Sequence, residues 1–488
     1  MATVADADRS AAEPVRPSRQ RIAANFLTLA GTGLCGLLVT IVVSAYVRRA
    51  LGPAAIGQLS WAVAAVSYLT VFANPGLTLV GQRELSRAPE QTERTLALLL
   101  TLQTMLAALV YGLVITLAAF EPRGPITSLL LAIQGLTLFL AAWNTGWALQ
   151  AHERMIAPSL AVLAFNALQL PALFLLVHSP DDLVIYAAVT LPFTLAGAGF
   201  NAWYLARKGF VHWLRMRPTL AGARGFLREA WPLALTQAAA LVILNSGTLI
   251  LGFSDGDEAV GQFASAYRLI LVPSVITWAL WTAYFPAFAR SHDRPTEASA
   301  LSREYIGLLA WLGLPIAALG WALGHHVVDL LFGPAFAASG RYFEWLCPTI
   351  GLNFLHFGVV ATLIPWGRSG LQLKIAASAA VLNLITNALL VPFYGPWGAV
   401  AASVGAELWV VALGLLIRRR LQLFWHPILP VIGPPLICSV AVAASLTALP
   451  TWFDGQWWVE LLAGAAVLGA CLVAFEGRTL VRLWKPQR

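Results

Sequence analysis

Charged residues are scarce in this sequence: they make up 11% of its 488 residues, whereas 59% are hydrophobic. A typical soluble domain carries about 25% charged residues. The apolar residues gather in runs of about 20, the length that an α-helix needs to cross a hydrocarbon core of about 30 Å. The composition therefore excludes a soluble protein. It indicates an all-α integral membrane protein whose aqueous segments are too short to fold as separate domains.

Several kinds of chemical site are missing as well. All four cysteines fall within apolar runs, where we expect small core residues rather than a disulfide set or a metal cluster. No glycine-rich loop of the phosphate-cradling kind occurs, so ATP is not used directly. The loop after the first span, RRALGPAA, contains no acid, whereas a membrane glycosyltransferase, polymerase or ligase needs acids or a histidine base in a substantial external loop. We therefore expect a protein that is not an enzyme and that holds no metal and no cofactor.

The apolar runs predict about fourteen membrane-spanning helices, near residues 22–46, 56–79, 95–119, 127–149, 157–178, 183–206, 231–252, 260–288, 305–324, 344–366, 371–391, 397–417, 427–448 and 456–475. If both termini lie in the cytosol, 26 of the 31 Lys and Arg residues fall in cytosolic segments. Positive residues stay on the cytosolic side because their translocation is unfavourable. Orientation in a membrane thus explains the net charge of +8 without nucleic acid as a partner. The six basic residues between the sixth and seventh spans either serve this orientation alone or also attract anionic lipid headgroups.

Two short patterns occur twice, six spans apart. AIGQL around Gly57 returns as AVGQF around Gly261, and NALQLP in the fifth span returns as NALLVP in the eleventh. An even number of spans separates the copies, so both have one orientation, as in transporters built from parallel repeats. We predict two six-helix lobes that rock against each other around a cavity. The predicted boundaries are a disordered cytosolic tail (1–20), an N-lobe of helices 1–6 (21–206), a cytosolic linker (207–230), a C-lobe of helices 7–12 (231–417), and helices 13 and 14 with a cytosolic tail (418–488).

One arginine, Arg268, falls inside a predicted span. It lies about eight residues into the eighth span, roughly 12 Å below the external surface. A guanidinium that faces lipid there costs at least about 2.5 kcal/mol. Arg268 therefore either faces a cavity inside the protein or extends outward to the headgroups. In a cavity its planar fork suits phosphate or carboxylate, which predicts an anionic substrate.

Residues of the first span are candidates to complete such a site. Asn25, Thr28 and Thr32 recur at helical spacing, and they either line a watery cavity or allow close helix packing. Arg48 and Arg49, at the external end of this span, either bind the same anion or anchor the helix at the membrane surface. We treat all five as candidate substrate-binding residues.

Two further titratable residues, His356 and Glu407, fall in the middle of the tenth and twelfth spans. Ionisable residues inside a membrane usually mark ion or substrate pathways. Glu407 is a candidate counter-ion for Arg268, or a carboxylate that couples transport to a proton or sodium gradient. His356 is a candidate proton relay or a hydrogen-bonded helix contact. We predict that these two residues carry any ion coupling.

The segment RRALGPAAIGQLSWAVAAVSYLTVFANPGLTLVGQRELSR, residues 48–87, resembles the start of bacterial polysaccharide flippases of the multidrug/oligosaccharidyl-lipid/polysaccharide export superfamily. The recurring features are Leu51-Gly52-Pro53, Gly57, Pro75-Gly76 and Arg83-Glu84. VGQFASAYRLI and TNALLVPFYGPWGAVAAS are similar to that family's eighth helix and to its junction of helices 11 and 12. The resemblance covers residues from about 20 to 475 and contains no catalytic motif.

The resemblance implies a flippase that moves a lipid-linked oligosaccharide, usually on undecaprenyl pyrophosphate, from the cytosolic to the outer leaflet by alternating access. It implies that Arg268 engages the pyrophosphate, that the last two helices hold the lipid tail, and that polysaccharide polymerase machinery is a possible partner. A lipid II flippase is one alternative. The predicted first span contains no arginine, unlike those flippases, which favours another saccharide. A cation-coupled multidrug exporter is the second alternative, but it would carry acids in the first or seventh span, and neither has one.

Overall fold

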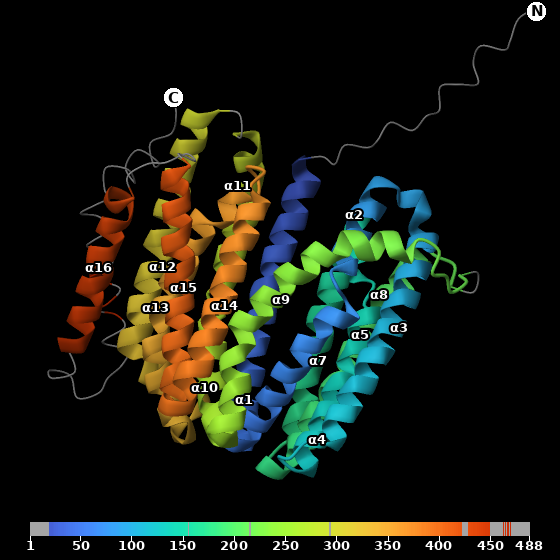
Figure 1. Cartoon of the computed structure of the whole chain (residues 1–488), viewed down its shortest axis with the longest axis horizontal. Helices are drawn as coiled ribbons and strands as arrows, with labels where there is room; N and C mark the ends of the chain where they lie inside the picture. The colour runs from blue at the N-terminus through green and yellow to red at the C-terminus, as the bar shows by residue number, and fades with distance from the viewer. Residues whose placement is uncertain are drawn as a thin grey trace, which may run out of the picture.

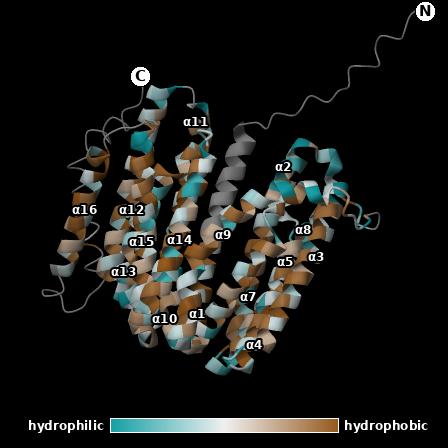
Figure 2. Ribbon diagram, viewed as in Figure 1, coloured by the Kyte–Doolittle hydropathy of each residue, from teal (hydrophilic) through white to brown (hydrophobic). Residues whose placement is uncertain are grey.

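The structure is a computed structural model that describes residues 19–154, 156–213, 216–291, 294–421 and 428–448, together with residues 462, 464, 466, 467 and 469. Side chains are described from residue 35 onward. All regular elements in this part of the chain are helices, so the prediction of an all-α membrane protein is confirmed. Figure 2 shows hydrophobic residues along most of the helix lengths, whereas hydrophilic residues gather around the short helix α2.

The helices divide into an earlier and a later group (Figure 1). The earlier group comprises α1 (Arg19–Ala73), α2 (Leu77–Arg87), α3 (Thr92–Ala119), α4 (Pro125–Gly135), α5 (Thr137–Trp143), α6 (Gly146–Ala151), α7 (Ile156–Leu176) and α8 (Leu183–Arg207). The later group comprises α9 (Ala223–Ser254), α10 (Gly256–Ile270), α11 (Ser274–Arg290), α12 (Pro295–Phe332), α13 (Ala337–Val359), α14 (Ser369–Tyr394), α15 (Pro396–Arg420) and α16 (Leu429–Ala448).

Twelve segments of the described chain are long and apolar enough to span a membrane. The first of them, Cys35–Ala73, overlaps both of the first two predicted spans, because α1 consists of two helical halves that meet at a sharp bend at Gly52. Gly52 has φ 75°, a backbone conformation that favours glycine, and Pro53 follows it. The last predicted span, 456–475, lies outside the described residues apart from five isolated positions. The predicted count of about fourteen spans is therefore a close approximation.

Helix α9 connects the two groups. It begins at Ala223, inside the predicted linker, and runs diagonally across the molecule in Figure 1. Its first turns pack against the earlier group, where Ala230 is fully buried in a cluster with residues of α2 and α3. Its second half belongs to the later group, since the hydroxyl of Ser246 donates to Asn383 Oδ1 on α14 at 2.6 Å. A single helix is thus fixed to both groups at opposite ends.

The two copies of the repeated glycine pattern contact each other where α1 crosses α10. A Cβ atom on Gly57 would overlap the backbone carbonyl of Asp257, and a Cβ atom on Gly261 would overlap that of Pro53. Each carbonyl lies four residues before the opposite glycine, so the two contacts are equivalent under a local two-fold rotation. This symmetry is what a parallel repeat predicts. The glycines are required because only they permit such a close backbone approach.

We expect Gly261→Ala to destabilise the fold by about 1–3 kcal/mol, since the added methyl group meets backbone atoms that cannot rotate away. Thermal unfolding of the purified protein measures this effect. Gly405→Ala on α15 is the matched control, because a Cβ atom there has no neighbour within 4 Å. Equal midpoints for the two variants would contradict the close crossing.

Candidate functional site

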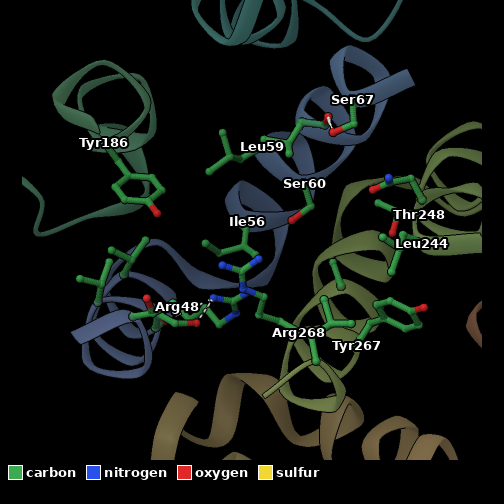
Figure 3. Close-up of a pocket in the computed structure, with 18 of the residues that line it drawn as sticks. Arg48, Ile56, Leu59, Ser60, Ser67, Tyr186, Leu244, Thr248, Tyr267 and Arg268 are labelled. Carbon is green, nitrogen blue, oxygen red and sulfur yellow. Dashed lines mark hydrogen bonds between the residues drawn. The ribbon is translucent and has the colours of Figure 1, made fainter. Parts of the chain in front are cut away.

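A cavity of about 430 Å³ lies where α1, α8, α9 and α10 meet. Both halves of the bent α1 line it, through Thr40 and Ser44 on one side of Gly52 and Ser60 and Ser67 on the other. Figure 3 shows this cavity with two arginine side chains extending into it from different helices. Since the first half of the chain supplies α1 and α8 and the second half supplies α9 and α10, the cavity lies at the seam between the two repeats.

Arg268 borders this cavity from the last turn of α10. The helix ends at Ile270 because Pro273 follows, so the guanidinium lies at a helix C-terminus, where the backbone dipole favours a positive charge. The same side chain also borders a small adjoining cavity next to Phe332. The structure thus places Arg268 at a cavity between the helix groups, and its role in binding a substrate stays a prediction.

Arg48 enters the same cavity from α1. Its Nε donates to the hydroxyl of Ser265 on α10 at 2.9 Å, and its Nη1 donates to the hydroxyl of Ser44. The guanidinium carbon lies 4.9 Å from the centre of the Phe332 ring, a cation–π distance. These contacts fix the orientation of Arg48. Its Nη2 group has no hydrogen-bond partner within the described part of the chain, so it is available to a ligand.

The predicted first span ended too early. Its boundary at residue 46 left Arg48 outside the membrane helix, whereas α1 continues in helical conformation up to the bend at Gly52. The predicted first span contains no arginine, whereas the helix itself carries Arg48 before the bend, at the position named above as a candidate for the anion site. A charged residue ends a hydropathy run, but the backbone hydrogen bonds of a helix do not depend on it.

The cavity has a strongly positive character. The guanidinium groups of Arg48 and Arg268 lie next to each other in Figure 3 and are close enough to repel. No carboxylate is found among the described residues that line the cavity. Two like charges in a site of low dielectric favour binding of an anion that neutralises both.

Tyr186 on α8 points its hydroxyl into the cavity toward these arginines (Figure 3). Sequence reasoning missed this residue. A tyrosine close to the start of a span is typical of the interfacial belt, so its position along the sequence carried no signal for a cavity. Only the packing of α8 against α1 identifies it.

Arg49 is directed elsewhere. Its Nε donates to the carbonyl of Leu331 at 3.0 Å and its Nη2 to that of Leu330 at 2.6 Å. These carbonyls belong to the last turn of α12, which has no further helical partners for them. Arg49 therefore caps a helix and does not line the cavity.

The remaining candidates on the first span cannot be placed in the same detail. Asn25, Thr28 and Thr32 lie in the part of α1 whose side chains are outside the described residues. The four-residue spacing of Thr28 and Thr32 continues through Thr40 and Ser44, and both of these line the cavity. The predicted polar stripe thus extends into the site at its described end.

Glu407 and His356 are brought together, away from the arginines. His356 Nδ1 on α13 lies 3.5 Å from Glu407 Oε2 on α15, and neither residue lines the arginine cavity. Neither of these two atoms has a hydrogen-bond partner among the described residues. Tyr267, which does line the cavity, is within electrostatic range of Glu407. The structure therefore pairs Glu407 with His356 rather than with Arg268.

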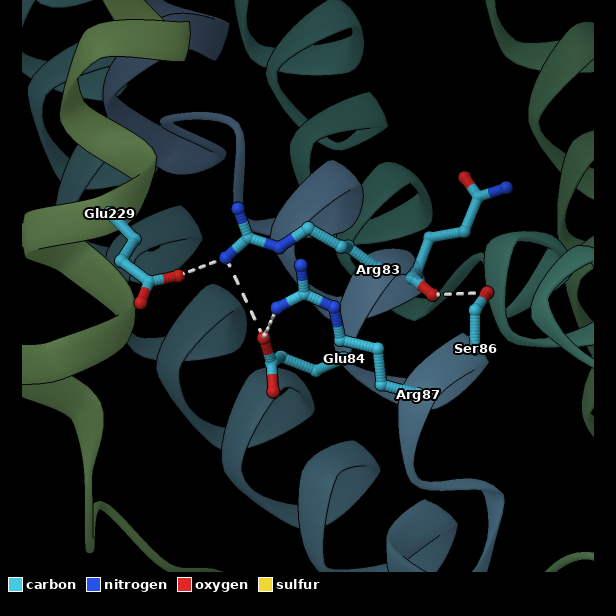
Figure 4. Close-up of polar contacts among 6 residues, drawn as sticks. Arg83, Glu84, Ser86, Arg87 and Glu229 are labelled. Atoms are coloured by element: carbon cyan, nitrogen blue, oxygen red, sulfur yellow. Dashed lines mark hydrogen bonds and ion pairs between the residues drawn. The ribbon is translucent and has the colours of Figure 1, made fainter.

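Ion pairs connect the two groups of helices at both ends of the molecule. Arg123, after α3, pairs with Asp257 on α10, and its guanidinium carbon lies 4.4 Å from the centre of the Trp61 ring. At the other end Arg83 of α2 pairs with Glu229 of α9 (Figure 4). The Arg83 pair is exposed and contributes little to stability. The Arg123 pair is largely buried beside the α1–α10 crossing, with side chains 13% and 24% exposed.

Comparison with known proteins gives consistent results. The family model described as polysaccharide biosynthesis protein matches residues 22–292. A protein of Shigella dysenteriae whose name marks it as a candidate O-antigen transporter is 27% identical over 386 residues, covering 77% of this chain and 94% of that protein.

Solved structures match the fold. The lipid II flippase MurJ in an inward closed conformation matches with a TM-score of 0.76 at 12% identity, covering 94% of this chain and 100% of that one. An inward-facing multidrug resistance MATE family transporter of the MOP superfamily matches with a TM-score of 0.61 at 16% identity, covering 79% of this chain and 95% of that one. At these identities the likeness shows a shared transporter fold.

Proposed function

The chain belongs to the polysaccharide biosynthesis protein family, and from this premise we propose that it is a flippase for a polyprenyl-diphosphate-linked oligosaccharide. The substrate moves from the cytosolic to the outer leaflet of the bacterial inner membrane, with both termini of the chain in the cytosol. One observation carries the proposal: two guanidinium groups from different halves of the chain share a cavity lined by no described carboxylate.

A diphosphate is the headgroup that this arrangement suits best. It carries more than one negative charge, and arginine forks bind phosphate oxygens through paired hydrogen bonds. Arg48 is fixed to Ser265 and Ser44, so it offers a preorganised donor, whereas Arg268 has no hydrogen-bond partner within the described residues and is free to close on the ligand. The hydroxyl of Tyr186 supplies a further donor on the opposite wall.

Transport follows from the location of the arginines on both halves. A headgroup bound by Arg48 and Arg268 links α1 to α10, so the movement of one lobe against the other carries the bound charge with it. The sugar stays in the polar part of the cavity, and the polyprenyl chain extends into the bilayer. External polymerase machinery would then use the delivered repeat unit.

The two alternatives differ in how well they fit the cavity. A multidrug exporter that binds cations requires acidic residues, and the described lining of this cavity contains none. A lipid II flippase handles the same diphosphate, and the presence of Arg48 beside Arg268 removes one argument against it. The relative named for O-antigen transport favours a saccharide repeat unit over the peptidoglycan precursor.

Glu407 and His356 are the residues that we propose for coupling to a proton or sodium gradient. Their side chains are 19% and 26% exposed and lie within the apolar part of the C-lobe. A charged carboxylate in such surroundings costs free energy. It is therefore stabilised when it takes up a proton or binds a cation. Tyr267, which lines the arginine cavity, interacts electrostatically with Glu407.

Transport by arginine variants tests the headgroup site. In proteoliposomes with a fluorescent polyprenyl-diphosphate oligosaccharide, we expect Arg268→Ala and Arg48→Ala each to slow translocation at least tenfold, the factor for about 1.4 kcal/mol of lost binding to a charged group. Arg268→Lys should retain more activity than Arg268→Ala, because it keeps the charge.

Arg49→Ala is the matched control for the arginine variants. It removes the same charge from the neighbouring position but affects only the helix cap on Leu330 and Leu331. Near-normal translocation is expected from this variant when it is as well folded as wild type. Wild-type rates in both alanine variants of the cavity arginines would exclude them from the site.

Glu407→Gln tests the coupling. We expect wild-type translocation to accelerate under an imposed proton or sodium gradient, and the variant to lose this response while it keeps its affinity for the diphosphate headgroup. Rates measured with and without each gradient, together with headgroup binding at equilibrium, separate the two effects. An unchanged gradient response in Glu407→Gln would rule out this carboxylate as the coupling group.

A further inference from the structure

A second cavity lies beneath the segment that joins α8 to α9. Its volume is about 360 Å³, within the usual range of about 300–1,000 Å³ for ligand pockets. One wall is a face of α3 from Ala97 to Met105, and another is Trp143 at the end of α5. The third wall is formed by Trp213 and by residues 216–218 of the joining segment. It shares no lining residue with the arginine cavity.

The joining segment is fastened over this cavity at several points. The indole Nε1 of Trp213 donates to the carbonyl of Ala202 on α8 at 3.1 Å. The backbone N–H of Thr219 donates to the hydroxyl of Thr101 on α3 at 3.3 Å. The backbone N–H of His212 donates to the carboxylate of Glu93 at 2.7 Å. The wall is therefore held by directional bonds on both sides of the cavity.

Apart from Arg217, the polar side chains among the described lining residues already take part in hydrogen bonds. The hydroxyl of Thr101 donates to the carbonyl of Ala97 at 2.6 Å, and that of Thr104 accepts the indole N–H of Trp143 at 3.1 Å. The remaining walls are apolar and include Met105, Met216 and Leu100. Because the polar groups are already satisfied, the cavity selects an apolar ligand portion such as a hydrocarbon chain.

One positively charged side chain, that of Arg217, lies at the rim of this cavity. Arg217 lines the cavity and is exposed, and no ion pair or hydrogen bond joins it to any other residue that the structure describes. Trp143 and Trp213 flank the same opening, and tryptophan is the residue type favoured at the level of lipid headgroups. An apolar chamber with a guanidinium at its mouth matches an amphiphile with a hydrocarbon chain and a negative headgroup.

We propose that this cavity binds one acyl chain of an anionic phospholipid from the surrounding bilayer, with the phosphate against Arg217. The bound lipid contacts α3 and α5 as well as the segment that leads into α9. Its occupancy therefore strengthens the attachment of this connection to the N-lobe. This site is independent of the substrate cavity and does not rest on the proposed transport function.

Native mass spectrometry of the full-length protein in detergent measures the first bound lipid directly. We expect phosphatidylglycerol to bind about fivefold more tightly than phosphatidylcholine with the same acyl chains, the effect of about one basic residue near a membrane surface. Arg217→Gln should remove this preference. Met105→Trp, which fills the cavity from an exposed position on α3, should lower the occupancy by both lipids.

Arg224→Gln is the matched control, since Arg224 is an exposed guanidinium close by in the sequence that does not line this cavity. It should keep the wild-type preference. A phosphatidylglycerol probe with a photoreactive acyl chain should label peptides that contain residues 97–105 or 216–218.

Three results would overturn the proposal. The first is equal binding of the two phospholipids by the wild-type protein. The second is an equal loss of preference in Arg217→Gln and Arg224→Gln. The third is displacement of the photoreactive lipid by a polyprenyl diphosphate at lower concentration than by phosphatidylglycerol, which would assign the cavity to the transported lipid.

Discussion

Two positive side chains share one cavity within the membrane-spanning part of this chain. An isolated arginine at this depth already costs about 2.5–3.5 kcal/mol on insertion scales, and a second guanidinium beside it adds repulsion that a low dielectric strengthens. Part of this cost is offset by the contacts of Arg48 with Ser265, Ser44 and the Phe332 ring. The described residues that line the cavity include no carboxylate that could offset the remaining cost. Under the proposed function, an anion in this site would neutralise both charges.

The glycine crossing of α1 and α10 determines how close the arginines lie. Gly57 and Gly261 let the two backbones touch, and Arg268 follows two helical turns after Gly261. The Arg48–Ser265 hydrogen bond also joins these two helices. Separation of α1 from α10 would break that bond and move the guanidinium groups apart. Under the proposed function, the affinity of the cavity for a diphosphate would therefore depend on the relative position of the two helix groups, which is the coupling that alternating access requires.

Hydropathy alone predicted the fold class and nearly all of the spans, because the hydrocarbon core constrains helix length and composition directly. The repeated glycine pattern predicted that the two halves of the chain are parallel repeats of each other. Hydropathy misplaced the end of the first helix, since a helix that lines a cavity tolerates a charge such as Arg48. With that boundary the sequence left open whether Arg48 enters the cavity or anchors the helix at the membrane surface, and the structure places it in the cavity.

The direction in which a side chain points from its helix was harder to predict from the sequence than the ends of the helices. Arg48 and Arg49 are neighbours in sequence, yet one enters the cavity and the other caps α12. The pairing of Glu407 with His356 depends on how α13 and α15 pack, and the orientation of Tyr186 depends on α8. None of these follows from the pattern along a single helix. They require the rotation and register of neighbouring helices, which only the assembled structure provides.

The central claim is that both arginines hold one headgroup, and a double-mutant cycle on equilibrium binding tests it most directly. Affinity for a polyprenyl diphosphate would be measured for the wild type, Arg48→Gln, Arg268→Gln and the double variant. Groups that share one ligand are energetically coupled, so we expect the losses to be non-additive by at least about 0.5 kcal/mol. Losses that add within experimental error, or single variants that bind like the wild type, would contradict the shared site.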